Sequence, residues 1–187
     1  MTIDLKSKRC PFQEWPKIPR LKEGAVTITE KIDGTNACII IQDNVIVGVQ
    51  SRKRLIYPEN DNYGFAGWVN RNSEDILRLG EGRHYGEWAG LGIQKNPMSL
   101  LGKRFFLFNV SRYDPENLPY NVSMVPHIYT GPIADVDIPK LMSDLKDERE
   151  LNSGYTPEGI IVYHHNLRCY EKATYQNPQG KYLNDKG

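Results

Sequence analysis

The sequence predicts an α+β fold with antiparallel sheets. Two pairs of apolar, β-rich runs, 37–41 with 45–49 and 158–163 with 167–172, are each joined by three polar residues, a pattern typical of β-hairpins. The aromatic run 104–110 has the same strand-forming composition. Because the strands outnumber the helices and follow one another through hairpins, neighbouring strands are expected to run antiparallel.

Only two segments carry a helical pattern. Ser73 is expected to cap a helix over residues 74–79, which Gly80 ends. Residues 138–151 predict a longer helix with leucines on one mixed face.

Two further runs and the N-terminal segment complete the chain. The run 26–29 predicts a strand, and 85–88 predicts a short strand that enters a glycine-rich loop. Residues 1–22, rich in lysine, arginine and proline, are expected to form an irregular arm around the domain. With no internal repeat or obvious linker, residues 1–187 are expected to form a single domain.

The composition limits the partners and the compartment. There are 24 Lys and Arg against 23 Asp and Glu, a net charge of +1, so a phosphate-rich partner would have to meet a local basic groove. No apolar run reaches the ~20 residues of a membrane helix. No apolar segment follows the charged N-terminus, so a secretory signal peptide is not expected. Cys10, Cys38 and Cys169 are odd in number and widely spaced, which favours reduced thiols in the cytoplasm, with Cys38 in the core.

Lys31 is the first candidate for chemistry. It lies in segment 30–36, Glu-Lys-Ile-Asp-Gly-Thr-Asn, at the end of a strand-like run. A neutral lysine amine can attack the α-phosphate of a nucleotide, and burial or a neighbouring cation favours loss of its proton. Gly34 lets the backbone turn sharply and approach a ligand. Taken alone, Lys-x-Asp-Gly fits a surface hairpin turn equally well.

Three polar side chains follow at the ends of predicted strands. Arg52, in a basic triplet after 45–49, suits phosphate or ribose oxygens, although a solvated strand end carries the same residues. Glu87 stands beside the glycine-rich loop, where its carboxylate can accept from ribose hydroxyls or face solvent. Glu158 opens an apolar strand and can help position a hydrated divalent cation near phosphates.

Taken in order, these segments resemble the covalent nucleotidyltransferase superfamily of ATP-dependent ligases and capping enzymes, most closely its nick-sealing, phage-type RNA ligase family. Segment 30–36 is similar to the first motif of that family. Segment 86–96, Gly-Glu-Trp-Ala-Gly-Leu-Gly-Ile-Gln-Lys-Asn, is similar to its third. The resemblance runs from about Thr27 to Lys172 and implies the family's adenylylation domain, an ATP-grasp-like nucleotidyltransferase fold.

The resemblance implies a role for each matching residue. Lys31 would carry AMP taken from ATP, with Mg²⁺ or Mn²⁺ held near Glu158 through water. Phe108 would stack on the base, although an aromatic ring in so apolar a strand also suits core packing. The nucleotide would be bound by Glu30, Ile32, Asn36, Arg52, Glu87, Phe108, Glu158 and Lys172. Contacts to the nucleic acid are implied for Asn36, Arg52 and Arg54.

Two features depart from the family pattern. Its last motif carries two lysines one residue apart, whereas here Tyr170 stands at the first position and Lys172 at the second. One cation fewer beside the transferring phosphate is expected to slow the transfer, unless Arg168 or Lys181 compensates. Nick-sealing members also have a further C-terminal domain, which a protein partner would have to supply.

The implied function is that of an ATP-dependent ligase that joins a 3′-hydroxyl to a 5′-phosphate, at free RNA ends or at a nick in an RNA or RNA/DNA duplex. Its nucleic-acid groove would be lined by basic residues, namely Arg52, Lys53, Arg54, Lys103, Arg104, Lys172 and Lys181. Three alternatives stay open: a ligase-like module that binds a nucleotide or an RNA end without sealing it, a DNA ligase, and a capping guanylyltransferase.

Other nucleotide and metal sites lack their sequence signatures. The glycines of segment 80–86 have the wrong spacing for a dinucleotide loop, and no Gly-Lys-Ser/Thr phosphate loop occurs. The four histidines are not spaced as zinc ligands with one another or with the cysteines.

Overall fold

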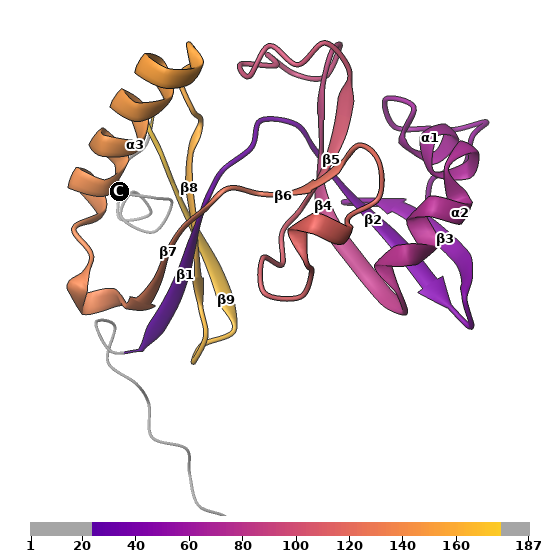
Figure 1. Ribbon diagram of the computed structural model, residues 1–187, viewed down its shortest axis with the longest axis horizontal. Helices are drawn as coiled ribbons and strands as arrows, with labels where there is room; N and C mark the ends of the chain where they lie inside the picture. The colour runs from indigo at the N-terminus through magenta and orange to yellow at the C-terminus, as the bar shows by residue number, and fades with distance from the viewer. Residues whose placement is uncertain (1–23, 177–187) are drawn as a thin grey trace, which may run out of the picture.

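The computed structural model describes residues 24–176. The predicted arm at 1–22, Cys10 and Lys181 therefore lie outside the described residues. Within this range, nine strands form two sheets that lie side by side, with helices on their outer sides (Figure 1). The predicted α+β fold with antiparallel sheets is confirmed. No helix of residues 24–176 is long and apolar enough to cross a membrane.

The first sheet, called sheet A, is antiparallel throughout. Across the sheet its strands are β7 (His127–Pro132), β1 (Ala25–Glu30), β8 (Gly159–His164) and β9 (Cys169–Thr174). The β8–β9 pair is the second hairpin that the sequence predicted. Side chains alternate between the two faces of a strand, so one face of sheet A carries the apolar residues of β1 and β8 and the other is more polar.

Helix α3 (Ile138–Ser153) covers the apolar face of sheet A (Figure 1). Met142 and Leu145 are buried against β1, β8 and β9. The Asp137 side chain accepts from the amide of Lys140 at the N-terminus, and Gly154 ends the helix with φ 67°. The helix predicted over 138–151 is confirmed and ends at Ser153.

The second sheet, called sheet B, contains the other predicted hairpin. Across the sheet its strands are β3 (Val45–Ser51), β2 (Thr35–Gln42), β4 (Gly82–Gly90), β5 (Lys103–Leu107) and β6 (Val122–Met124). All pairs are antiparallel except β5–β6, which is parallel. Asp43 and Asn44 form the turn between β2 and β3 with φ of 51° and 57°, the positive φ values that a two-residue hairpin turn requires.

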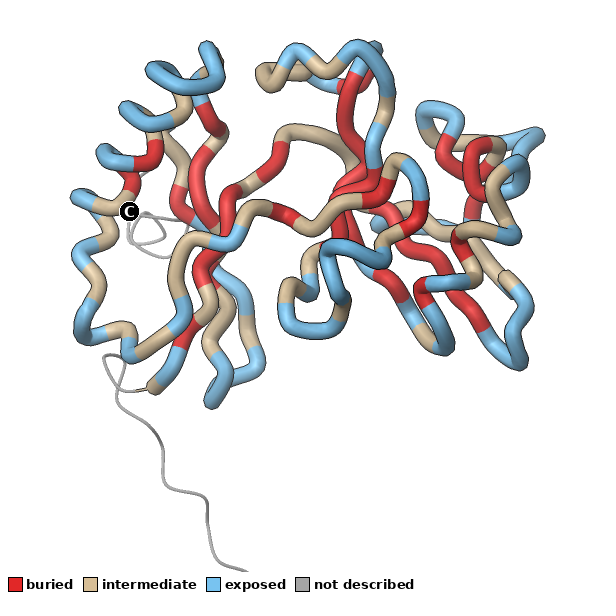
Figure 2. Tube along the Cα trace, viewed as in Figure 1, coloured by how far each residue is buried: buried red, intermediate tan, exposed pale blue. Residues whose placement is uncertain are grey.

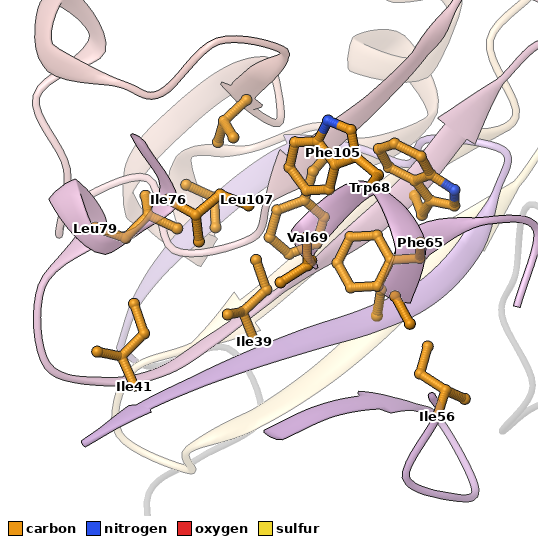
Figure 3. Packing of buried hydrophobic residues seen from close by; sticks show 14 of the residues in the cluster. Ile39, Ile41, Ile56, Phe65, Trp68, Val69, Ile76, Leu79, Phe105 and Leu107 are labelled. Atoms are coloured by element: carbon orange, nitrogen blue, oxygen red, sulfur yellow. The ribbon is translucent and has the colours of Figure 1, made fainter. Parts of the chain in front are cut away.

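Three short helices cover the outer face of sheet B: α1 (Phe65–Arg71), α2 (Ser73–Ile76) and the 3₁₀ helix η1 (Leu77–Leu79). Phe65 and Trp68 of α1 pack on Phe105 and its neighbours in the core shown in Figure 3. The prediction that Ser73 caps the second helix is wrong. Asn72 occupies the cap position because α1 runs directly into α2 there, and its side chain donates back to the Trp68 carbonyl over 2.7 Å and does not cap α2.

Two short crossings connect the sheets (Figure 1). Residues 31–34 lead from β1 to β2, and residues 125–126 lead from β6 to β7. The second crossing is bonded to the end of β1, because the Glu30 amide donates to the Pro126 carbonyl over 2.9 Å. Ile32 and Val125, one from each crossing, pack together with two residues of sheet B. Burial follows the strands of both sheets, while the outer side of α3 is exposed (Figure 2).

Candidate active site

Lys31 is the first residue of the crossing from sheet A to sheet B. It alternates with Glu30, so its side chain lies on the face of sheet A that α3 does not cover. Its Nζ donates to Glu158 Oε2 over 2.6 Å, and its amide donates to the Gly159 carbonyl over 2.9 Å. The side chain is only 20% exposed. The amine is therefore fixed where the two sheets meet.

Gly34 allows the crossing to lie directly against β4. A Cβ at this position would come within 2.5 Å of the Trp88 carbonyl oxygen and 2.9 Å of Glu87 Cγ. Both distances are under 3.0 Å, closer than Cβ atoms come to other atoms in proteins, so a side chain here would force the backbone to shift. This approach carries the segment that holds Lys31 up to the strand that holds Glu87.

Glu87 supplies a buried carboxyl group on the same side of sheet B as the crossing. It lies opposite Asn36 in the β2–β4 ladder, and Asn36 Nδ2 donates to its Oε2 over 3.0 Å. Burial raises the pKa of Glu87 to about 7. Lys31 opposes this rise in the pKa, while Glu158 and Asp33 add to it. The Glu87 carboxyl group is therefore protonated more readily than an exposed glutamate.

The carboxylate of Glu30 points to the opposite side of sheet A. It is 2% exposed and accepts from Arg149 Nε over 2.8 Å and from the Tyr155 hydroxyl over 2.7 Å. Burial and the Glu30 charge raise the pKa of Tyr155 well above its usual range. The side chain of Glu30 is thus bonded to Arg149 of α3 and to Tyr155, away from Lys31, and its role in binding the nucleotide stays a prediction. Nothing in the sequence pattern pointed to Arg149 or Tyr155.

Ile32 and Phe108 belong to one apolar cluster beside Glu87. Ile32 is buried against Ala89, Phe106 and Val125, and Phe108 packs partly buried on the same group. Phe108 follows β5 and does not lie within it. Phe106, which the sequence analysis did not single out, lies directly opposite Glu87 in the ladder. The cluster forms an apolar floor next to the charged groups.

The three basic residues after β3 differ in whether their side chains make hydrogen bonds within residues 24–176. Arg52 and Lys53 are exposed and make no hydrogen bond or ion pair with residues 24–176. Arg52 follows Ser51, which lies opposite Ala37, so its backbone is at the same sheet end as Asn36. Arg54 instead donates to the Asn60 carbonyl over 2.9 Å and organises the following loop.

The remaining predicted cations are distributed over three surfaces. Lys172 of β9 lies opposite Ile161, on the same face of sheet A as Lys31. Arg104 donates to Ser123 Oγ over 2.8 Å on the edge of sheet B. Lys103 donates to the Tyr63 carbonyl over 2.7 Å, on the side of sheet B that α1 covers, so it is not brought to the site.

The site fits a hydrated divalent cation better than a fully protein-bound one. Among residues 24–176, no three His, Cys, Asp or Glu side chains gather as a metal cage. Glu158, 34% exposed, presents hard carboxylate oxygens beside Lys31, and Mg²⁺ typically takes one or two carboxylates while keeping several waters. Cys38 and Cys169 are free thiols, and Cys38 is buried as predicted.

Known proteins with a similar sequence or fold were compared with this chain. A family model described as RNA ligase matches residues 24–182. The fold is similar to that of a Naegleria gruberi RNA ligase mutant solved with ATP and Mn, with 21% identity and a TM-score of 0.59 over 82% of this chain and 50% of that one. Another mutant of that ligase, with AMP and Mn, gives 21% identity and a TM-score of 0.57 over the same shares. The chain spans about half the length of these structures. No curated protein matches.

Proposed function

This chain belongs to the RNA ligase family, and from that premise we propose that it uses ATP to join 3′-hydroxyl and 5′-phosphate RNA ends through a covalent Lys31–AMP intermediate. One observation carries the proposal. The Lys31 amine is fixed between two sheets, 2.6 Å from Glu158 and beside the buried Glu87. A surface hairpin turn would leave the amine in solvent.

In the first step the neutral Lys31 amine attacks the α-phosphorus of ATP. A nitrogen–phosphorus bond forms, the bond from that phosphorus to the bridging oxygen breaks, and pyrophosphate leaves with the electron pair. Glu158, whose Oε2 lies 2.6 Å from Nζ, orients the amine and stands where it can accept the proton that the nitrogen gives up. Asn36 and Glu87 hold the ribose side of the nucleotide.

In the second step an oxygen of the RNA 5′-phosphate attacks the phosphorus of the AMP on Lys31. The nitrogen–phosphorus bond breaks, the lysine nitrogen takes up a proton, and AMP becomes joined to the RNA end. In the third step a 3′-hydroxyl oxygen attacks the 5′-phosphate, loses its proton and displaces AMP. Arg52, exposed at the sheet end beside Asn36, is proposed to contact the RNA. These steps depend on in-line positioning and on charge neutralisation.

A bound Mg²⁺ or Mn²⁺ would neutralise part of the phosphate charge, and Glu158 would hold it through water. Lys172, on the same face of sheet A as Lys31, adds one protein cation to that side of the phosphates. The pair of lysines that the family places here is reduced to this one, because Tyr170 stands at the other position.

The proposal is tested by incubating the protein with α-labelled ATP and Mg²⁺, then denaturing it. We expect a label that stays on the wild-type chain, disappears from Lys31→Ala, and is not formed from GTP. Equal labelling of the wild type and Lys31→Ala would remove Lys31 from the role of nucleophile. Lys53→Ala, which removes an exposed amine without a partner among residues 24–176, is the matched control and should label normally.

A second candidate function is a module that binds a nucleotide or an RNA end without sealing it. Tyr170 at the first lysine position of the last motif favours it, because one positive charge fewer would stabilise the transferring phosphate. A nicked duplex that already carries AMP on its 5′-phosphate separates the two functions. Sealing of that substrate supports the ligase. Tight binding without a joined product supports the module, and it would point to a protein partner for the later steps.

A further inference from the structure

The face of sheet A that α3 leaves uncovered carries a pair of stacked tyrosines. Tyr163 of β8 lies directly opposite Tyr170 of β9. Their ring centroids are 4.7 Å apart and the rings are tilted by 36°. Tyr170 is 66% exposed, and neither hydroxyl group has a hydrogen-bond partner among residues 24–176. A large aromatic surface is therefore open to solvent.

The tyrosine pair lies on the same face as the proposed nucleophile. In the sheet register Tyr163 is beside Thr27, Ile161 is beside Thr29, and the next residue of that face is Lys31. Four residues along a strand span roughly 13 Å, on the order of the rise of four stacked nucleotides. Along the strands of this face, Lys172 lies between the two tyrosines and Lys31.

The charges around the pair suit a polyanion. In β1, β8 and β9 the acidic residues are Glu30 and Glu171. Glu30 bonds Arg149 of α3, and Glu171 bonds His164, so both carboxylates belong to the covered face. On the open face, His165 lies 5.2 Å from the Tyr163 ring and bonds the Thr27 hydroxyl over 2.9 Å. Lys172, hydroxyl groups and imidazole thus surround the rings.

We propose that Tyr163 and Tyr170 form a stacking platform for unpaired bases of the RNA strand whose end lies at Lys31. The proposal rests on the proposed ligase function and adds the form of its substrate. Aromatic side chains stack on bases whose faces are free, as in single strands, loops and frayed ends. Bases inside an intact duplex hide those faces, so the platform selects RNA that is single-stranded next to the joint.

The test uses RNA oligonucleotides with the fluorescent base 2-aminopurine at each of the first four positions from the 3′ end and, in a second series, from the 5′-phosphate end. Stacking on tyrosine should quench the probe in at least one series. Tyr170→Ala should weaken binding of these single strands by at least about fivefold and abolish the quenching, because each base–aromatic stack contributes about 1–3 kcal/mol. Tyr170→Phe, which keeps the ring, should bind within about twofold of the wild type.

Tyr120→Ala is the matched control, because Tyr120 is 74% exposed on a different part of the fold, and it should bind like the wild type. Equal binding by Tyr170→Ala and the wild type would overturn the platform, as would a loss in Tyr170→Phe as large as that in Tyr170→Ala. Binding of a fully paired nicked duplex that depends on Tyr170 equally strongly would also overturn the selection of unpaired RNA. ATP labelling of the wild-type chain, measured in parallel, tests the ligase function separately. Thermal unfolding of each variant excludes a folding defect.

Discussion

Gly34 is a single residue whose missing side chain sets the distance between the two halves of the site. Replacing it with alanine forces its Cβ against the Trp88 carbonyl, 2.5 Å away, and the Glu87 side chain. The crossing must then move away from β4 and take Lys31 with it. Because a misplacement of about 1 Å at a reacting group costs on the order of 100-fold in rate, Gly34→Ala should lose ATP labelling to that extent.

The matched control for this change is Gly102→Ala, at a glycine where an added Cβ meets nothing within 4 Å. It should label at the wild-type rate. If Gly34→Ala also labels at that rate, the close approach of the crossing to β4 is not needed for the chemistry.

Glu87 makes the stability of the fold depend on pH. Its pKa rises from 4.5 to about 7 in the folded chain, so its contribution is fully present below pH 4.5 and is lost as the pH rises through 7. The loss amounts to about 3 kcal/mol, from 1.36 kcal/mol for each pKa unit. Glu87→Gln removes the charge. Part of this loss already occurs below pH 5, so the variant's free energy of unfolding relative to the wild type should increase from pH 5 to pH 8 by about 2.5 kcal/mol. Urea denaturation at each pH measures the change. A difference that stays constant over this range would contradict the raised pKa.

The residues that the sequence assigned to one site are brought together only in part. Lys31 and Glu158, 127 positions apart, share an ion pair, and Asn36 bonds Glu87. The order of the motifs and the resemblance that rests on it predicted this grouping. The side-chain direction of Glu30 could not be predicted, because it depends on Arg149, a helix residue with no sequence signal linking it to β1. The functional role of each residue stays a prediction.

At the scale of elements, helix α3 is tied to the strand that precedes Lys31 by a buried ion pair. Arg149 donates to Glu30, whose side chain is 1% exposed. Arg149→Met leaves that carboxylate buried without its cation, which should cost about 3–5 kcal/mol in the free energy of unfolding. Urea denaturation at neutral pH measures it. Lys140→Met, which breaks an exposed pair with Asp144 on the same helix, should lower the free energy of unfolding far less. Equal losses in the two variants would mean that the buried Arg149–Glu30 pair stabilises the fold no more than an exposed pair.

The elements that the sequence predicted are those whose signals are local. The β2–β3 turn at Asp43 and Asn44 depends on neighbouring residues alone. Helix α1 was missed because its seven residues are too few for a helical repeat, and its stability comes from packing Phe65 and Trp68 on sheet B. The parallel β5–β6 pair joins three-residue β6 to the strand that precedes it, and so short a strand has no pattern of its own.

At the scale of the whole molecule, the site exists because two sheets are held together by two touching crossings. The crossing at 31–34 carries the amine, and the crossing at 125–126 supports it through the Glu30–Pro126 hydrogen bond. The sequence predicted both hairpins, but it contained no information on how two sheets would be placed. That arrangement depends on Ile32, Val125 and Phe106 packing together, and these residues are far apart in the chain.

A nucleotide bound at Lys31 should therefore protect both sheets at once. With AMP at 100 times its Kd, binding is worth about 2.7 kcal/mol. We expect slower hydrogen exchange at residues 31–34, at 86–88 of β4 and at 159–161 of β8, because all three segments line the meeting of the sheets. A hollow of about 550 Å³ lies on the other side of sheet A, between α3 and β7, and it serves as the internal control. Protection that appears only around this hollow, or in one sheet alone, would mean that the nucleotide is held elsewhere and that the two sheets do not act as one site.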